Sequence, residues 1–338
     1  MIWGLGFVAQ RYGMEYVGPF LFAGARFILG ALTLVIVLLA SGWLTRRRLR
    51  RQMGAPGSGK GSADRKDGRS NLNGRPDPAA LLTADQHEGE QPSLAWVFPS
   101  AHLIKGGVLC GLAILLGGSL QAAGMVYTPA AKAGFLTALY IVLVPILGIL
   151  IKQKTHWNSW VAVIIAAVGL YFLSITNGLA IQLGDGILII SAFFWAAHIL
   201  LIDHYVADLG MREVLKLCVV QFITAGVLGF VCMPFFDHFF VQTVLNWPAL
   251  SMALVPILYA GVISTGLAFT LQAIGQKGLN PTAAALIMSL EAVFSVIGGM
   301  LILGEVLTVR EAVGCGLMFV AVVLAQLRSQ AGARDRLA

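Results

Sequence analysis

The stretch LQAAG at residues 120–124 recurs as LQAIG at residues 271–275, at an offset of 151 positions. A second match follows each copy, because TPAA at 128–131 corresponds to NPTA at 280–283, now at an offset of 152 that continues through the next apolar stretch. Two matches in the same order and at nearly the same offset indicate an internal repeat. The repeat divides the chain into two halves.

The composition identifies the solvent around these halves. Hydrophobic residues make up 58% of the 338 positions and charged residues 12%, against roughly 45–50% and about 25% in soluble domains. A soluble fold of this size has no interior large enough to bury so much apolar surface. The chain is therefore predicted to be a multi-span membrane protein. Extended disorder and a nucleic-acid-binding module are excluded for most of its length.

Windows of about 20 mostly apolar residues mark the predicted spans. These spans must be helices, because backbone groups in lipid need partners within their own segment and the windows lack the alternation of barrel strands. The first window is short, which indicates either a start upstream of residue 1 or a tilted, shallow span. Ten windows are found, at residues 1–16, 19–40, 103–127, 129–151, 157–175, 186–206, 214–236, 247–273, 281–303 and 310–327.

The predicted fold class is thus an all-α membrane protein with ten transmembrane helices. Each half contains five spans, an odd number, so the halves face opposite ways as two inverted five-helix repeats. We expect the first repeat at residues 1–176, the second at 177–329, and a tail at 330–338. Inverted repeats place a substrate site near the bilayer midplane, and rocking of the halves opens that site to alternate sides. The symmetry therefore predicts a transporter, and an enzyme has no need of it.

A long polar segment at residues 45–91 interrupts the first repeat. It is rich in Gly, Ser and Pro, carries ten of the 23 Lys and Arg residues, and is predicted to be a disordered linker. Basic loops stay on the cytoplasmic side, so we expect both termini to be cytoplasmic in a multi-pass protein of the cell (inner) membrane. The basic segment also suits anionic lipid headgroups, although a simple orientation signal explains it equally well.

No cofactor, metal site or catalytic residue is predicted. The four cysteines form no CxxC pair, so neither a zinc site nor a disulfide framework is indicated. The Gly-rich stretches lack the spacing of a phosphate-binding loop. The expected partners are a small-molecule substrate and the lipid bilayer, with the chain as a monomer or homodimer and no nucleic acid bound.

Three ionisable residues lie within the predicted spans, where a charge costs about 2.5–3.5 kcal/mol. Glu291 lies about 16 Å along its helix, near the midplane, where a carboxyl can exchange a proton or bind a substrate amine. Arg26 has the planar fork that suits a carboxylate or phosphate. Lys132 shares a helix face with Tyr140, which lies about 12 Å deeper. The alternatives are structural: Glu291 pairs with Arg26 or Lys132, or the cations extend to the interface.

Two further pairs of side chains are predicted to contribute to the site. Gln121 and Gln272 occupy matching positions of the repeat and are expected to form hydrogen bonds across helices or to the substrate. Trp3 and Trp195 lie at roughly corresponding places in the first and sixth spans. They either close two sides of a cavity or simply pack.

The chain also resembles the EamA-type transporters of the drug/metabolite transporter superfamily over nearly its whole length outside residues 45–91. The resemblance implies ten helices in two EamA repeats, and efflux or exchange of small polar metabolites. The short first span and the basic insert depart from the family pattern. The similar stretches are IWGLGFVAQ (2–10), GPF (18–20), RF (26–27), GA (30–31), LQ (120–121), YT (127–128), AKAGF (131–135), LY (139–140), LEAVF (290–294) and LGE (303–305).

These observations predict a proton-coupled secondary transporter, an exporter or exchanger of amino-acid-like or organic-anion metabolites, that works by alternating access. One alternative is a multidrug or cation efflux carrier, in which Glu291 dominates while Arg26 and Lys132 do not matter. The other is a membrane scaffold or lipid-handling protein without transport activity. That class needs a polar catalytic cluster at one interface, and none is found in the sequence.

Overall fold

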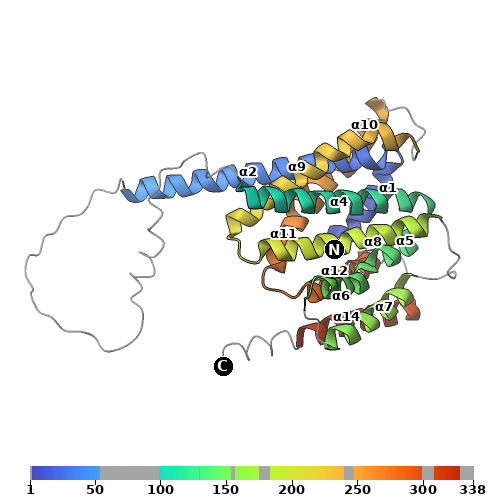
Figure 1. Ribbon diagram of the computed structural model, residues 1–338. Coiled ribbons are helices and arrows are strands. Elements are labelled where there is room, and N and C mark those ends of the chain that lie inside the picture. Colours follow the sequence, from blue (N-terminus) through green and yellow to red (C-terminus); the bar gives the residue numbers. More distant parts are fainter. Residues whose placement is uncertain are drawn as a thin grey trace, which may run out of the picture. The chain divides into compact units, whose positions relative to one another are not determined.

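The computed structural model describes residues 2–53, 99–128, 130–153, 157–174, 183–239, 247–298 and 308–327. All regular structure in these ranges is helical. The chain divides into two units, Leu39–Pro99 on its own and Met1–Leu38 together with Ser100–Ala338. The packing described below concerns the larger unit (Figure 1).

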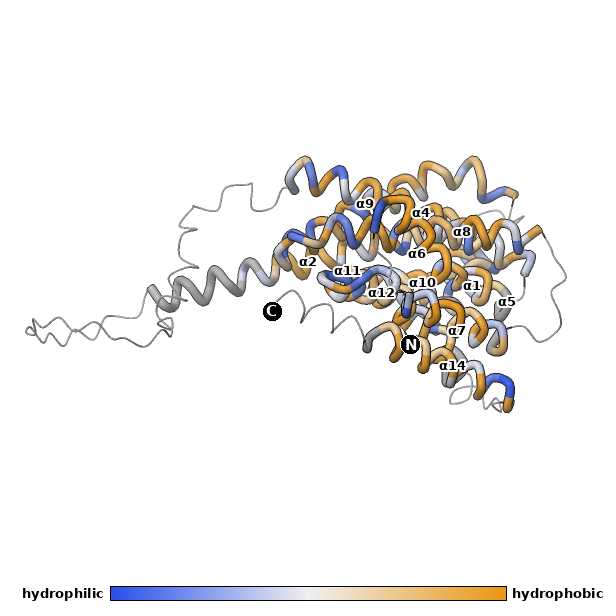
Figure 2. The backbone as a smooth tube through the Cα atoms, turned by 60° about the horizontal axis from the view of Figure 1, so that its bottom comes forward, coloured by the Kyte–Doolittle hydropathy of each residue, from blue (hydrophilic) through white to orange (hydrophobic). Residues whose placement is uncertain are grey.

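The described α-helices overlap the ten predicted windows, and several of them extend beyond the predicted ends. Six helical stretches are long and apolar enough to cross a membrane, and two shorter ones are apolar as well. Figure 2 shows apolar residues along most of their length. The all-α class is confirmed for the described residues, and the ten-span count stays a prediction. The first-half helices are α1 (Ile2–Met14), α2 (Pro19–Met53), α4 (Ala101–Tyr127), α5 (Ala130–Ala138), α6 (Tyr140–Leu150) and α7 (Trp157–Ser174).

The described elements of the second half begin at residue 183, after α7. They are α8 (Leu183–Val206), α9 (Met211–Phe236), η3 (Asp237–Phe239), α10 (Trp247–Leu258), η4 (Tyr259–Phe269), α11 (Thr270–Gln276), α12 (Pro281–Ser289), α13 (Glu291–Gly298) and α14 (Val309–Leu327). Asn280 accepts a hydrogen bond from the backbone N–H of Thr282 and Pro281 occupies the first turn. This arrangement is a standard helix start.

The helix α2 corrects one prediction. It continues to Met53, so residues 45–53, which were predicted to belong to a disordered linker, are helical. After Thr45, this stretch consists of five arginines with Leu49, Gln52 and Met53, residue types that favour helix, and the first glycine comes at position 54. The remaining residues of the predicted linker, 54–91, lie outside the described part of the chain.

The fourth and ninth predicted spans are each divided in two. Leu139 separates α5 from α6 with φ −58° and ψ −12°, and Leu290 separates α12 from α13 with φ −59° and ψ −11°. The N–H of Leu139 donates to the carbonyl of Leu136 at 3.3 Å, and that of Leu290 to Ile287 at 3.2 Å. Both are tightened turns of the 3₁₀ type. They lie 151 positions apart, so the 152-residue offset that the sequence predicts for this stretch is wrong at these turns.

The eighth predicted span differs from its counterpart, the third. The third span is the uninterrupted helix α4. In the eighth, an 11-residue π-helical stretch, η4, connects α10 to α11. Pro256 lies just before it and has no N–H to continue the α-helical hydrogen bonds. Such wide turns are rare and often occur at functional sites.

The two halves pack against each other through several helix pairs. α4 contacts α8 and α9, and α7 contacts α14 (Figure 1). α1 contacts α10, η4 and α13. α2 crosses α9 at two glycines, because a Cβ on Gly229 would lie 2.8 Å from the backbone nitrogen of Gly24. Small residues at such crossings allow close backbone approach in membranes. As a result, helices from both halves surround one interior.

Candidate functional site

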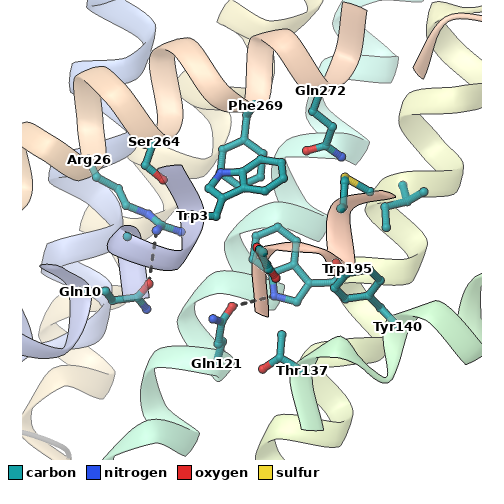
Figure 3. A pocket seen from close by; sticks show the side chains of 14 residues that line it. Trp3, Gln10, Arg26, Gln121, Thr137, Tyr140, Trp195, Ser264, Phe269 and Gln272 are labelled. Carbon is teal, nitrogen blue, oxygen red and sulfur yellow. Dashed lines mark hydrogen bonds between the residues drawn. The ribbon is translucent and has the colours of Figure 1, made fainter. Parts of the chain in front are cut away.

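A cavity lies between the helices of the two halves (Figure 3). The volume that the centre of a water-sized molecule can occupy in this cavity is about 70 Å³. This volume is several times the ~10–15 Å³ that one ordered water needs on the same measure. The space therefore accommodates a small polar molecule. Its walls are formed by Trp3, Gly6, Gln10, Arg26, Gln121, Thr137, Tyr140, Trp195, Ile199, Ser264, Phe269, Gln272, Met288 and Glu291.

The structure brings together seven of the eight residues that the sequence singled out. Lys132, the eighth, belongs to α5, and its side chain lies outside the described part of the structure. The binding and coupling roles of all eight stay predictions. The seven that line the cavity are Trp3, Arg26, Gln121, Tyr140, Trp195, Gln272 and Glu291.

The cavity walls follow the internal repeat. Tyr140 and Glu291 are the first residues of α6 and α13, and each comes directly after the tightened turn that divides its span. The two halves therefore supply corresponding positions to one cavity. Three pairs of lining residues are 151 positions apart: Gln121 with Gln272, Thr137 with Met288, and Tyr140 with Glu291.

Arg26 is buried in the cavity wall with a side chain only 6% exposed. Its Nη1 donates to Oε1 of Gln10 at 3.5 Å (Figure 3), a long hydrogen bond. Its guanidinium lies 4.6 Å from the centre of the Phe27 ring. Gly118 provides the space for this group, because a Cβ at that position would lie 2.6 Å from Nη2. The cation is thus held by weak contacts and leaves hydrogen-bonding capacity for a ligand.

Glu291 is partly buried and borders the same cavity. Tyr140 lines this cavity as well. Within the described residues, no ion pair joins Glu291 to Arg26, so that structural alternative is not seen there. Pairing with Lys132 involves a side chain outside the described part.

An aromatic wall faces these polar groups. Phe269 stacks on Trp195, with ring centres 5.7 Å apart and an angle of 3° between the planes. Trp3 packs against Phe269 at 5.0 Å. The two tryptophans thus flank one phenylalanine and form a single wall (Figure 3).

The two glutamines of the repeat have different partners. The Nε1 of Trp195 donates to Oε1 of Gln121 at 2.9 Å, a hydrogen bond between α8 and α4 of the kind predicted for Gln121. Gln272 instead donates to Gln276 on its own helix at 3.2 Å. Its Oε1 is left for another donor.

Several buried polar atoms at the cavity have no hydrogen-bond partner among the described residues. Buried polar groups in proteins nearly always have one. The unpartnered atoms of cavity-lining residues include donors and acceptors, so together they suit a polar molecule. They are Trp3 Nε1, Arg26 Nε, Thr137 Oγ1 and Gln272 Oε1.

Sequence reasoning missed several lining residues. Gln10 was detectable, because it is a polar residue within the first apolar window. Phe269 carried no such signal, since aromatic residues are common in membrane spans. Behind it, His198 lies edge-on at 6.1 Å and shares a buried 3.1 Å hydrogen bond with Gln221. That polar pair lies in two apolar windows and supports the aromatic wall.

The described residues bring together no group of three or more His, Cys, Asp or Glu side chains. The cavity-lining residues include one carboxyl, Glu291, and one permanent cation, Arg26. This arrangement can bind groups of either charge. It has no metal-ligand set among the side chains that line the cavity.

Comparisons with known proteins agree with the fold. The model of the EamA-like transporter family matches residues 79–175 and 182–327. An uncharacterized transporter from Archaeoglobus fulgidus is 31% identical over 225 residues, which cover 66% of this chain and 69% of that protein. A solved crystal structure, described only as that of a protein, is 16% identical with a TM-score of 0.63, and the match covers 98% of this chain and 95% of that one. The last likeness concerns the fold alone. The chain belongs to the EamA-like transporter family and is a multi-pass membrane transporter.

Proposed function

We propose that this transporter is a secondary carrier that exports or exchanges small polar metabolites of the amino-acid-like or organic-anion kind. One observation carries the proposal: Arg26 and Glu291 line one cavity, with no ion pair between them in the described structure. Burying a charge without a partner costs free energy, so a substrate that supplies the opposite charge stabilises each group. A zwitterion supplies both, with its carboxylate on the guanidinium and its ammonium on the carboxyl.

Alternating access between two inverted five-helix repeats is the proposed mechanism. The pairing of cavity residues at an offset of 151 supports it, because the two halves contribute corresponding positions to one site. The divided spans support it as well. Transporters built from inverted repeats form their sites from discontinuous helices near the bilayer midplane.

Proton coupling is proposed to depend on Glu291. A single carboxyl at the cavity binds either a proton or the ammonium group of the substrate, and the two compete for it. A proton that binds Glu291 on one side of the membrane then releases the substrate on that side. The carrier thereby exchanges substrate for protons. Ionisable residues inside membranes commonly form such proton sites.

Transport by the purified chain in proteoliposomes tests the proposal. Zwitterions, organic anions and organic cations would each be offered to wild type, Arg26→Gln and Glu291→Gln. We expect Arg26→Gln to weaken transport of anions and zwitterions, and Glu291→Gln to weaken transport of zwitterions. Transport of cations that depends on Glu291 and is unchanged in Arg26→Gln would contradict the proposal. That result would favour a multidrug or cation carrier.

The proposed orientation places both termini in the cytoplasm, with the chain in the cell membrane. It rests on the Lys and Arg residues of residues 45–91 and of the other predicted inner loops. A cysteine at Ser58, in a background without the four native cysteines, should resist an impermeant thiol reagent in intact cells. A cysteine at Asn246, in a predicted outer loop, should react. The reverse pattern would show that the orientation is wrong.

A further inference from the structure

A second hollow, separate from the transport cavity, lies along α6 and α7. It holds about 420 Å³ and is lined by apolar side chains, among them Val142, Trp160 and Ala167. Its rim is open, since Val168 is 43% exposed and Tyr171 is 40% exposed. Among the described residues, none that lines this hollow also lines the transport cavity. On a multi-pass membrane protein, an open apolar groove of this kind faces the acyl chains of the bilayer.

The length of the groove matches one leaflet. Its lining runs along α7 from Trp160 to Tyr171, a rise of about 16 Å at 1.5 Å per residue. The hydrocarbon core of a bilayer is about 30 Å thick, so one leaflet contributes about 15 Å. An acyl chain lying in the groove therefore has its headgroup at one end of it.

A cation lies at the Tyr171 end. Arg310, in the first turn of α14, has its guanidinium carbon 5.4 Å from the ring centre of Tyr171 and 5.8 Å from that of Phe172. Its Nε is buried and has no hydrogen-bond partner in the described part of the chain. The adjacent carboxylate of Glu311 accepts hydrogen bonds from Thr308 at 2.9 and 2.7 Å. The guanidinium therefore lacks a carboxylate partner among the described residues.

We propose that the α6–α7 groove and Arg310 together bind one anionic phospholipid. The acyl chain fills the groove, and the headgroup phosphate accepts hydrogen bonds from the guanidinium. The planar fork of arginine matches a phosphate with two parallel hydrogen bonds. A phosphatidylglycerol-type headgroup has a net negative charge, which attracts this cation. A phosphatidylcholine headgroup contains its own cationic group, which balances the charge of its phosphate. In the proposed orientation the lipid belongs to the outer leaflet.

Native mass spectrometry of the full chain, released from nanodiscs of phosphatidylglycerol or phosphatidylcholine, tests this proposal. Wild type should retain one phosphatidylglycerol molecule in preference to phosphatidylcholine. Arg310→Gln should lower that retention about tenfold, because a charged hydrogen bond is lost. Arg310→Lys should lower it less. Lys105→Gln, the same change of charge at an exposed position of α4, is the control and should leave retention unchanged.

The groove is tested separately by Ala167→Trp, which fills the space with a larger side chain and leaves Arg310 in place. It should also lower phosphatidylglycerol retention. Thermal melting and size-exclusion profiles of each variant report whether it is folded. Equal retention in wild type and both Arg310→Gln and Ala167→Trp overturns the proposal, as does a second copy of the chain seated on this face after delipidation. Destabilisation by both Arg310→Gln and Glu305→Gln with unchanged lipid retention also overturns it, because Arg310 then pairs within the protein.

Discussion

Tyr140 and Glu291 occupy the same place in the two halves of the transporter. Each is the first residue after a tightened turn, and the leucines that form the two turns differ by one degree in φ and in ψ. Both side chains line the cavity, yet one is a phenol and the other a carboxyl. The backbone has kept the repeat at this point while the chemistry has diverged. At this pair of positions, the carboxyl that we propose exchanges a proton is therefore contributed by the second half.

The third and eighth spans show the same divergence at another pair of positions 151 apart. Gly118 leaves room for the guanidinium of Arg26, whereas Phe269 places a ring between two tryptophans. The regular helix α4 thus makes space for a cation, and the π-helical stretch η4 contributes an aromatic wall. The repeat sets where side chains meet the cavity, and the individual residues set what the cavity binds.

The largest expected effect comes from the Tyr140 and Glu291 pair. Glu291→Gln keeps the shape of the side chain but cannot change its charge, so we expect it to abolish net transport driven by a pH gradient while some substrate exchange remains. Tyr140→Phe removes one hydroxyl and should change rates by about two- to tenfold. Proteoliposomes with and without a pH gradient measure both. Intact pH-driven transport in folded Glu291→Gln would remove the proposed difference between the halves.

Changes to Gln121 and Gln272 should have smaller effects, with the first acting mainly on stability and the second mainly on substrate affinity. Gln121→Leu removes the acceptor for Trp195, so the free energy of unfolding should fall by about 0.6 kcal/mol and at most ~1.7 kcal/mol, the range for such bonds in membranes. Gln272→Leu should cost less stability and weaken apparent substrate affinity, because Gln272 lines the cavity and its Oε1 has no partner among the described residues. Thermal melting in detergent and transport KM separate the two. Equal effects of both changes on both measurements would contradict this division.

The sequence was most informative where membrane burial makes a residue costly. Arg26 and Glu291 were identified because a charge in an apolar span needs a reason, and Gln121 and Gln272 because the repeat aligns them. The structure places all four at one cavity. Phe269 was not identified from the sequence, because an apolar ring in an apolar span has no energetic penalty and no distinctive spacing.

Backbone irregularities were also beyond the sequence pattern. The turns at Leu139 and Leu290 contain neither proline nor glycine, so hydropathy shows one continuous span in each case. The π-helical stretch η4 has the same apolar composition as an ordinary helix. The end of α2 was misjudged for the opposite reason. Its last residues are polar and basic, and polarity was taken to indicate disorder although these residues favour helix.

Gly118→Ala tests the difference between the third and eighth spans. The added Cβ would lie 2.6 Å from Nη2 of Arg26, so the guanidinium must shift while the helix remains. We expect apparent affinity for anionic substrates to fall by about three- to tenfold, with stability nearly unchanged. Gly275→Ala, where an added Cβ meets nothing within 4 Å, is the matched control. Equal KM values in both variants would show that Gly118 does not position Arg26.

The smallest effect on transport is expected from shortening the connection after the second span, where the two halves differ most in loop length. Residues 54–91 extend the connection between the second and third spans, and the connection after α9 in the second half is far shorter. None of the described residues that line the cavity belongs to the unit Leu39–Pro99, and the composition of residues 54–91 cannot form a core. Removing residues 54–91 while keeping the basic residues at 46–51 should leave membrane level, orientation and initial transport rate unchanged. Scanning thiol labelling and transport per molecule of membrane-inserted protein measure these quantities. Lost transport at a normal membrane level would instead mean that this segment regulates the carrier, and the difference between the halves would then extend beyond the cavity.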